Sequence, residues 1–100
     1  HHDFALLETG KDAVSAEENS PGLHHVAFKV GDSLDELQHA KDWLSSNGVE
    51  PHRTRDHIAT QSVYFHDPDG NQIEIFVESD PSVWHNDPSL VATSNPLELR

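Results

Sequence analysis

The chain has 100 residues, of which 34% are hydrophobic, 18 are acidic, 6 are basic and none is cysteine, so its formal net charge is −12. This length indicates one small domain with a modest core, and the low apolar content suggests that part of the fold relies on another chain or segment. The composition argues against nucleic acid or an anionic membrane as a partner, and it excludes disulfides, thiolate metal sites and cysteine nucleophiles.

The first residues, HHDFALLETG, contain an apolar run at 3–8 that has the length of a strand, although it could equally form a buried helical turn. They lack the basic and apolar regions of a signal peptide, and no run in the chain reaches transmembrane length, so we expect a cytoplasmic protein. The two leading histidines are read most simply as the remnant of a purification tag. Residues 10–21 are polar and aperiodic, which predicts a linker loop.

The segment LHHVAFKV, residues 23–30, alternates between apolar and polar positions and predicts a strand. Ser33 and Glu36 then have the spacing of a capping box. Apolar residues recur at helical intervals until Asn47-Gly48 supplies a C-cap. We therefore expect an amphipathic helix of about four turns after the strand.

Three further strands are predicted. The first, residues 49–57, is weaker because Pro51 lies near its start. The other two, SVYFH and NQIEIFVE, are joined by the hairpin turn Asp67-Pro68-Asp69-Gly70. From Ser79 onward, three prolines among polar residues predict an ordered tail that wraps the domain without regular structure. The order is that of an α+β fold: a βαβββ unit with one extra strand before it.

Strand periodicity sorts the side chains onto two faces of the predicted sheet. The residues expected to pack against the helix are Val26, Phe28, Val30, Val63, Phe65, Ile73, Ile75 and Val77. The opposite face carries His25, Tyr64, Glu74 and Phe76. Imidazole and carboxylate are ligands of non-haem iron and manganese, so His25 and Glu74 are candidate metal ligands. In the alternative interpretation they are ordinary strand residues with Glu74 solvated, His57 is an exposed loop histidine and Tyr64 is a sheet aromatic.

The stretch GLHHVAFKVGD, followed by a helix and by YFHDPDGNQIEIF, resembles the vicinal oxygen chelate superfamily, which includes glyoxalase I, bleomycin-resistance proteins and extradiol dioxygenases. The resemblance covers residues 1–78. The spaced series of His57, Val63-Tyr64, Asp67-Pro68, Gly70 and Glu74 is similar to the signature of extradiol dioxygenases. The sequence departs from that pattern at Arg55, where the family prefers a small or aliphatic residue, and at Ile58, which replaces a glycine.

The resemblance implies a curved mixed sheet that forms a metal-binding cup for Fe(II), with Mn(II) as the alternative. His25 and Glu74 would be two of its three ligands, while His24 would point the other way. HHDFALLE resembles the last strand of a preceding module, in which the second histidine lines the active site, so by this resemblance His2 is native. Together with His57 and Tyr64, it would surround the substrate and oxygen as a catalytic residue.

The third ligand of the family is a histidine on the first strand of the preceding module, and it is absent here. We therefore expect the C-terminal part of a longer protein, with the last strand of the missing module at 1–9, a linker at 10–21, the βαβββ module at 22–78 and the wrapping tail at 79–100. The missing module is then a required partner.

The implied activity is extradiol cleavage of a catechol by O2 in the breakdown of aromatic compounds, by an enzyme that we expect to be a homo-oligomer. The 100-residue segment alone would be inactive. One alternative is a glyoxalase-type metal-dependent lyase or isomerase, which needs Glu74 but neither His57 nor Tyr64. Another is a bleomycin-resistance-type binding protein, which metal content would distinguish from both enzymes.

Overall fold

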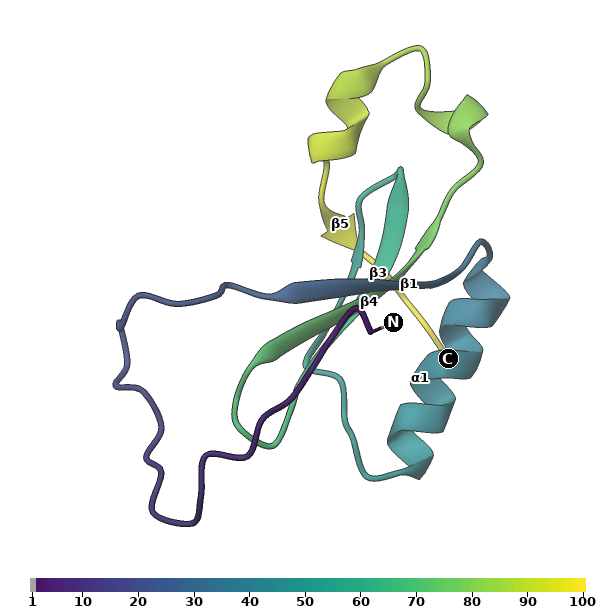
Figure 1. Ribbon diagram of the computed structural model, residues 1–100. Helices are drawn as coiled ribbons and strands as arrows, with labels where there is room; N and C mark the ends of the chain where they lie inside the picture. The colour runs from purple at the N-terminus through teal and green to yellow at the C-terminus, as the bar shows by residue number, and fades with distance from the viewer. Residues whose placement is uncertain (1) are drawn as a thin grey trace.

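The computed structural model describes residues 2–100, apart from the side chains of Pro88 and Val91. Its elements in chain order are β1 (Val26–Gly31), α1 (Leu34–Ser46), β2 (Arg53–Asp56), β3 (Thr60–His66), β4 (Gln72–Glu78), the short 3-10 helices η1 (Pro81–Val83) and η2 (Pro88–Ala92), and β5 (Asn95–Pro96) (Figure 1). The predicted βαβββ order is confirmed. No helix in the described part of the chain is long and apolar enough to cross a membrane.

The five strands form one mixed, open and curved sheet in the order β1-β4-β3-β2-β5. The β1–β4 pair is parallel, whereas the β4–β3, β3–β2 and β2–β5 pairs are antiparallel. Helix α1 lies against one face of the sheet (Figure 1). We call the other face the cup face. The register places Ala27 on one side of Glu74 and Tyr64 on the other, so side chains of three strands meet there.

Helix α1 begins with the predicted capping box. The Glu36 amide donates to Ser33 Oγ at 3.2 Å, and the Ser33 amide donates to Glu36 Oε2 at 3.1 Å. Gly31 allows this arrangement, because a Cβ atom at that position would lie 2.2 Å from Glu36 Oε2. The contacts that fix the junction between β1 and α1 are therefore made by residues close together in the sequence.

The core lies between α1 and the sheet. Its buried members are Leu37, Val63, Ile75 and Val77, with Ala40, Leu44, Phe65, Leu97 and Leu99 packed around them. Two predicted core residues differ from expectation, since Phe28 is 37% and Val30 40% exposed. Both lie on β1, which is an edge strand, so they have sheet neighbours on one side only.

The predicted strand at residues 3–8 is wrong for this structure, in which residues 2–25 form no helix or strand. Phe4 contacts Phe28 edge to face, with the ring centroids 5.6 Å apart, but Leu6 and Leu7 are 78% and 91% exposed. A strand needs a neighbour to satisfy its backbone hydrogen bonds, and this segment has none in the described structure. Residues 10–21 likewise form no helix or strand, and this segment projects from the body in Figure 1.

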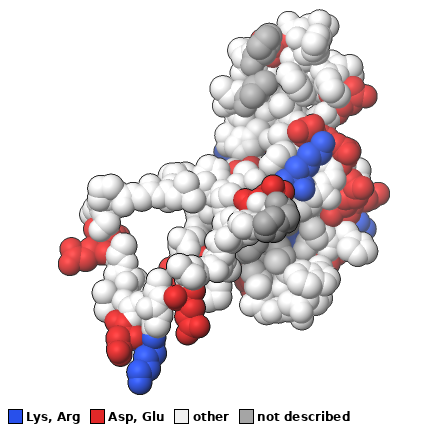
Figure 2. Space-filling view, viewed as in Figure 1, with Lys and Arg blue, Asp and Glu red and all other residues white. Residues whose placement is uncertain are grey.

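The tail after Ser79 is more regular than predicted, because it contains η1, η2 and the short strand β5. It then crosses to the helix face, where Leu97 and Leu99 pack against the core. The Gln38 side chain exchanges two hydrogen bonds of 2.7 Å with the backbone of Arg100. Figure 2 shows the acidic side chains spread over both the N-terminal loop and the body of the molecule.

Candidate metal and substrate site

His25 and Glu74 meet on the cup face, with His25 Nε2 3.1 Å from Glu74 Oε1. His25 immediately precedes β1, and Glu74 lies in the middle of β4. Glu74 is only 8% exposed, so the interpretation of it as a solvated strand residue is wrong. Its second oxygen, Oε2, accepts a 2.6 Å hydrogen bond from the hydroxyl of the fully buried Ser62. The carboxylate is thus held on one side by a hydroxyl and faces an imidazole on the other.

Tyr64 adjoins this pair from β3. Burial, together with the charge of Glu74 and a hydrogen bond to it, raises the pKa of the Tyr64 phenol above its usual value of 10.0. The Arg53 guanidinium lies over the Tyr64 ring, 4.4 Å from its centroid, and opposes this shift. The phenol therefore keeps its proton at neutral pH and can donate a hydrogen bond.

His57 is joined to the site through Tyr64. Its Nε2 lies 3.1 Å from the Tyr64 hydroxyl, and its Nδ1 lies 3.0 Å from the Thr93 carbonyl oxygen. A carbonyl can only accept, so the hydrogen bond assigns the proton of the neutral ring to Nδ1. Nε2 then has a free lone pair, which competes with the Glu74 carboxylate for the single proton of the Tyr64 hydroxyl. A base and a proton donor are therefore in contact beside the His25–Glu74 pair.

The donor set of the pair fits a divalent metal ion in part. An imidazole nitrogen and a carboxylate oxygen are the ligand types of non-haem iron and manganese centres, and here the two converge from different strands. Within residues 2–100 no group of three histidine, aspartate or glutamate side chains is close enough together to hold a metal ion. The described residues thus bring together two side chains of the types that bind such a metal.

Residues 1–75 match the sequence profile of the Glyoxalase/Bleomycin resistance protein/Dioxygenase superfamily. The chain belongs to this superfamily. The predicted resemblance to the vicinal oxygen chelate proteins is therefore confirmed, as is the α+β module with its curved, open sheet.

Three curated proteins show the relationship in more detail. Biphenyl-2,3-diol 1,2-dioxygenase 2 of Rhodococcus globerulus is 34% identical over 79 residues, which cover 79% of this chain and 41% of that protein. Biphenyl-2,3-diol 1,2-dioxygenase 3 of the same organism is 34% identical over 85 residues, with coverage of 79% and 42%. Catechol-2,3-dioxygenase of Bacillus subtilis (strain 168) is 35% identical over 83 residues, with coverage of 82% and 28%.

The chain spans less than half the length of each of these superfamily relatives, with shares of 41%, 42% and 28%. No solved structure gives a significant match.

Two further histidines were considered in the sequence: the predicted orientation of His24 is wrong, and the predicted role of His2 stays untested. His24 was expected to point away from His25, which is wrong, because the two Nδ1 atoms lie 2.6 Å apart. Strand alternation does not apply to them, since β1 begins only at Val26. His2 is exposed in the irregular segment before Phe4, and its catalytic role stays a prediction.

Sequence reasoning missed three residues around the site: Ser62, Arg53 and Thr93. The sequence carried a signal for two of them, because Arg53 alternates with Arg55 along one strand and Ser62 alternates with Tyr64 along the next. It becomes interpretable only once the register sets Arg53 opposite Tyr64 and Arg55 opposite Ser62. Thr93 carried no signal, because its contribution is a backbone carbonyl from the tail.

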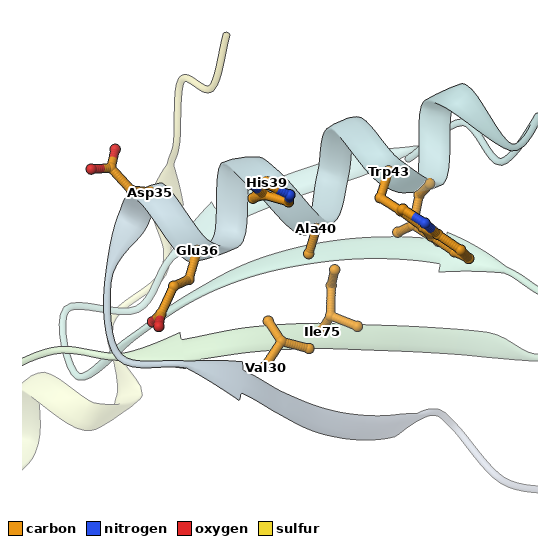
Figure 3. Close-up of a pocket in the computed structure, with 8 residues that line it drawn as sticks. Val30, Asp35, Glu36, His39, Ala40, Trp43 and Ile75 are labelled. Carbon is orange, nitrogen blue, oxygen red and sulfur yellow. The ribbon is translucent and has the colours of Figure 1, made fainter.

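A hollow of about 610 Å³ lies on the other side of the sheet, between α1 and the strands (Figure 3). Val30, Ala40, Trp43 and Ile75 make it mostly apolar. The Glu36 carboxylate at its end is already engaged in the helix cap. This hollow therefore does not coincide with the chemical groups of the cup face.

Proposed function

We propose that this chain is the metal-binding portion of an extradiol dioxygenase that cleaves a catecholic substrate with O2. The observation that carries the proposal is the presence on one face of both the His25–Glu74 pair and the hydrogen-bonded Tyr64–His57 pair. The names of three relatives, all dioxygenases acting on aromatic diols, support the reaction class.

In this proposal, His25 Nε2 and Glu74 Oε1 hold Fe(II), or alternatively Mn(II), and residues 22–78 form the module that carries them. The third ligand comes from outside the described residues, in a further module of the intact protein. When bound, such a metal would supply electron transfer between the catechol and dioxygen.

The chain's own side chains handle protons and orientation. The protonated Tyr64 hydroxyl donates a hydrogen bond to a substrate oxygen and so orients the diol beside the ligand pair. When the Tyr64 proton turns to the substrate, the Nε2 lone pair of His57 is freed and accepts the proton that the catechol releases on binding. Imidazole suits this task because it can accept a proton and return it later in turnover.

A glyoxalase-type lyase or isomerase is the second candidate, since it would use the same glutamate. It requires neither Tyr64 nor His57, whereas here the two are hydrogen-bonded to each other at 3.1 Å. That contact favours the dioxygenase.

The test uses the intact protein supplied with Fe(II) and a simple catechol. We expect O2 consumption and a yellow ring-fission product. Turnover of a hemithioacetal without O2 uptake would instead establish the glyoxalase-type reaction. Failure to bind any divalent metal would leave a binding protein of the bleomycin-resistance type.

A further inference from the structure

The C-terminal tail reaches the cup face at the end of β2, although it lies beyond the residues 1–75 that match the superfamily. The short strand β5 pairs with β2, with Asn95 opposite Asp56 and Pro96 opposite Arg55. Figure 1 shows the tail leaving β4, passing through both 3-10 helices and returning to the sheet at β5. The chain just before β5 is thereby brought beside His57.

Arg55 binds the tail at Ser94 with two hydrogen bonds. Its Nε donates to Ser94 Oγ at 2.8 Å, and its Nη2 donates to the Ser94 carbonyl oxygen at 2.9 Å. A guanidinium that donates from two nitrogens fixes both the position and the angle of its partner. No carboxylate in the described structure forms an ion pair with Arg55. Both hydrogen bonds described for the Arg55 guanidinium are therefore made to the tail.

The residue next to Ser94 supplies the partner of His57. The Thr93 carbonyl oxygen lies 3.0 Å from His57 Nδ1, and His57 Nε2 lies 3.1 Å from the Tyr64 hydroxyl. A hydrogen bond to one ring nitrogen fixes both the tautomer of an imidazole and its orientation. For His57 this hydrogen bond comes from the Thr93 carbonyl, which directly precedes the residue that Arg55 binds, Ser94.

We propose that Arg55 is a positioning residue that acts on His57 through the tail. By binding Ser94 it holds the Thr93 carbonyl against His57 Nδ1, which keeps the ring in the Nδ1–H tautomer with Nε2 facing Tyr64. The inference rests on the proposed role of His57 in the dioxygenase. It also accounts for Arg55 itself, which departs from the family's preference for a small or aliphatic residue at this position.

Thr54 provides a matched control, because it also ties β2 to the tail. Its Oγ1 donates to the Leu97 carbonyl oxygen, four residues beyond Thr93 and on the helix side of the sheet. The substitution Thr54→Val removes this tail contact while leaving Arg55, Ser94 and Thr93 in place. A general need for tail docking would affect both variants alike, whereas the positioning role affects Arg55 alone.

The experiment compares Arg55→Gln with Thr54→Val in the intact protein, by metal content, kcat and KM for catechol, and by long-range 1H–15N spectra of the His57 ring. For Arg55→Gln we expect near-normal metal content and KM, a loss in kcat of about 10- to 100-fold, the usual range for a residue that orients an active-site group, and a mixture of His57 tautomers. Thr54→Val should retain wild-type kcat and a single tautomer.

A double-mutant cycle sharpens the test, because two residues acting through one group are not additive. Arg55→Gln combined with His57→Gln should be no slower than His57→Gln alone. Ser94→Ala, which removes one of the two acceptors of Arg55, should change kcat and the tautomer in the same direction but by less.

Wild-type kcat and a single His57 tautomer in Arg55→Gln would overturn the positioning role, as would additive losses in the double variant. If Arg55→Gln does not fold, a wild-type tautomer in Ser94→Ala would overturn it instead. Failure of the proposed function looks different: the wild-type protein would then show no ring cleavage, while the tautomer readout would still report on the contact between the tail and His57.

Discussion

The amide of Ile58 donates a 2.8 Å hydrogen bond to Oδ1 of Asp56, and Ile58 has a φ of 68°. A β-branched residue is rarely found in this left-handed region, which costs on the order of 1–3 kcal/mol. The carbonyl of the same residue accepts from the Gln61 and Ser79 side chains, so hydrogen bonds hold the turn at both ends. The turn contains His57, which immediately follows the last residue of β2.

Replacing Ile58 by glycine should therefore stabilise the protein, because glycine adopts positive φ without steric strain. We expect a net gain of about 1 kcal/mol in the free energy of unfolding, since the released strain exceeds the extra entropy of glycine in the unfolded chain. Denaturant unfolding measures it. Ile58→Ala is the control, as alanine keeps the strained φ and should give no gain.

Replacing His57 and replacing His25 should have different effects on metal content and turnover. His57→Gln is expected to leave metal content near wild type and to slow turnover by on the order of 10²- to 10⁴-fold, the range for a lost acid–base group. His25→Ala should remove both metal and activity, because it deletes one of the two proposed ligands. Metal analysis and steady-state kinetics on the same samples separate the two. A His57→Gln variant with wild-type turnover would contradict the dioxygenase assignment.

Ser62 should tune the metal affinity. Its buried hydroxyl donates to Glu74 Oε2 at 2.6 Å, which leaves Oε1 facing His25. Ser62→Ala removes this donor, so we expect metal binding to weaken by about 10- to 100-fold, as is usual when a partner of a ligand is lost. Competition with a chelator measures the change. Ser46→Ala, at the exposed end of α1, is the control and should bind metal normally.

Stability should fall in mild acid through His52. Its ring stacks on His66 with centroids 4.4 Å apart, and burial, followed by the charges of His66 and Arg53, lowers the pKa of His52 below 6.5. The unfolded chain then binds this proton more readily than the folded one. Stability due to His52 is complete above the unfolded pKa and is lost as the pH falls through that value towards the folded pKa.

Unfolding measured between pH 7.5 and 5 would show this loss. His66→Gln removes the charge of the second imidazole and should weaken the pH dependence, although the part due to burial remains. An unchanged pH dependence in that variant would show that the two rings do not interact electrostatically.

The local features of this protein followed from the sequence because their partners are close along the chain. Ser33 and Glu36 are one helical turn apart, so the capping box could be read directly, and it forms as predicted. The β3–β4 turn is likewise built within a few residues: Asp67 accepts from the amides of Asp69 and Asn71, and Gly70 has a φ of 87°. The placement of Tyr64 and Glu74 on one face also required only strand alternation.

Only the tertiary structure decided the features that depend on distant partners. Residues 3–8 have a strand pattern but no strand beside them, and His24 turns towards His25 because β1 begins after both. The burial of Glu74 depends on Ser62 from another strand, and the orientation of His57 depends on a carbonyl 36 residues away. Hydrogen bonds of this kind join groups that the chain brings together only after the sheet register is set. A pattern in the sequence can therefore identify His57 and Glu74 as candidate site residues, but it cannot identify the groups that form hydrogen bonds with them.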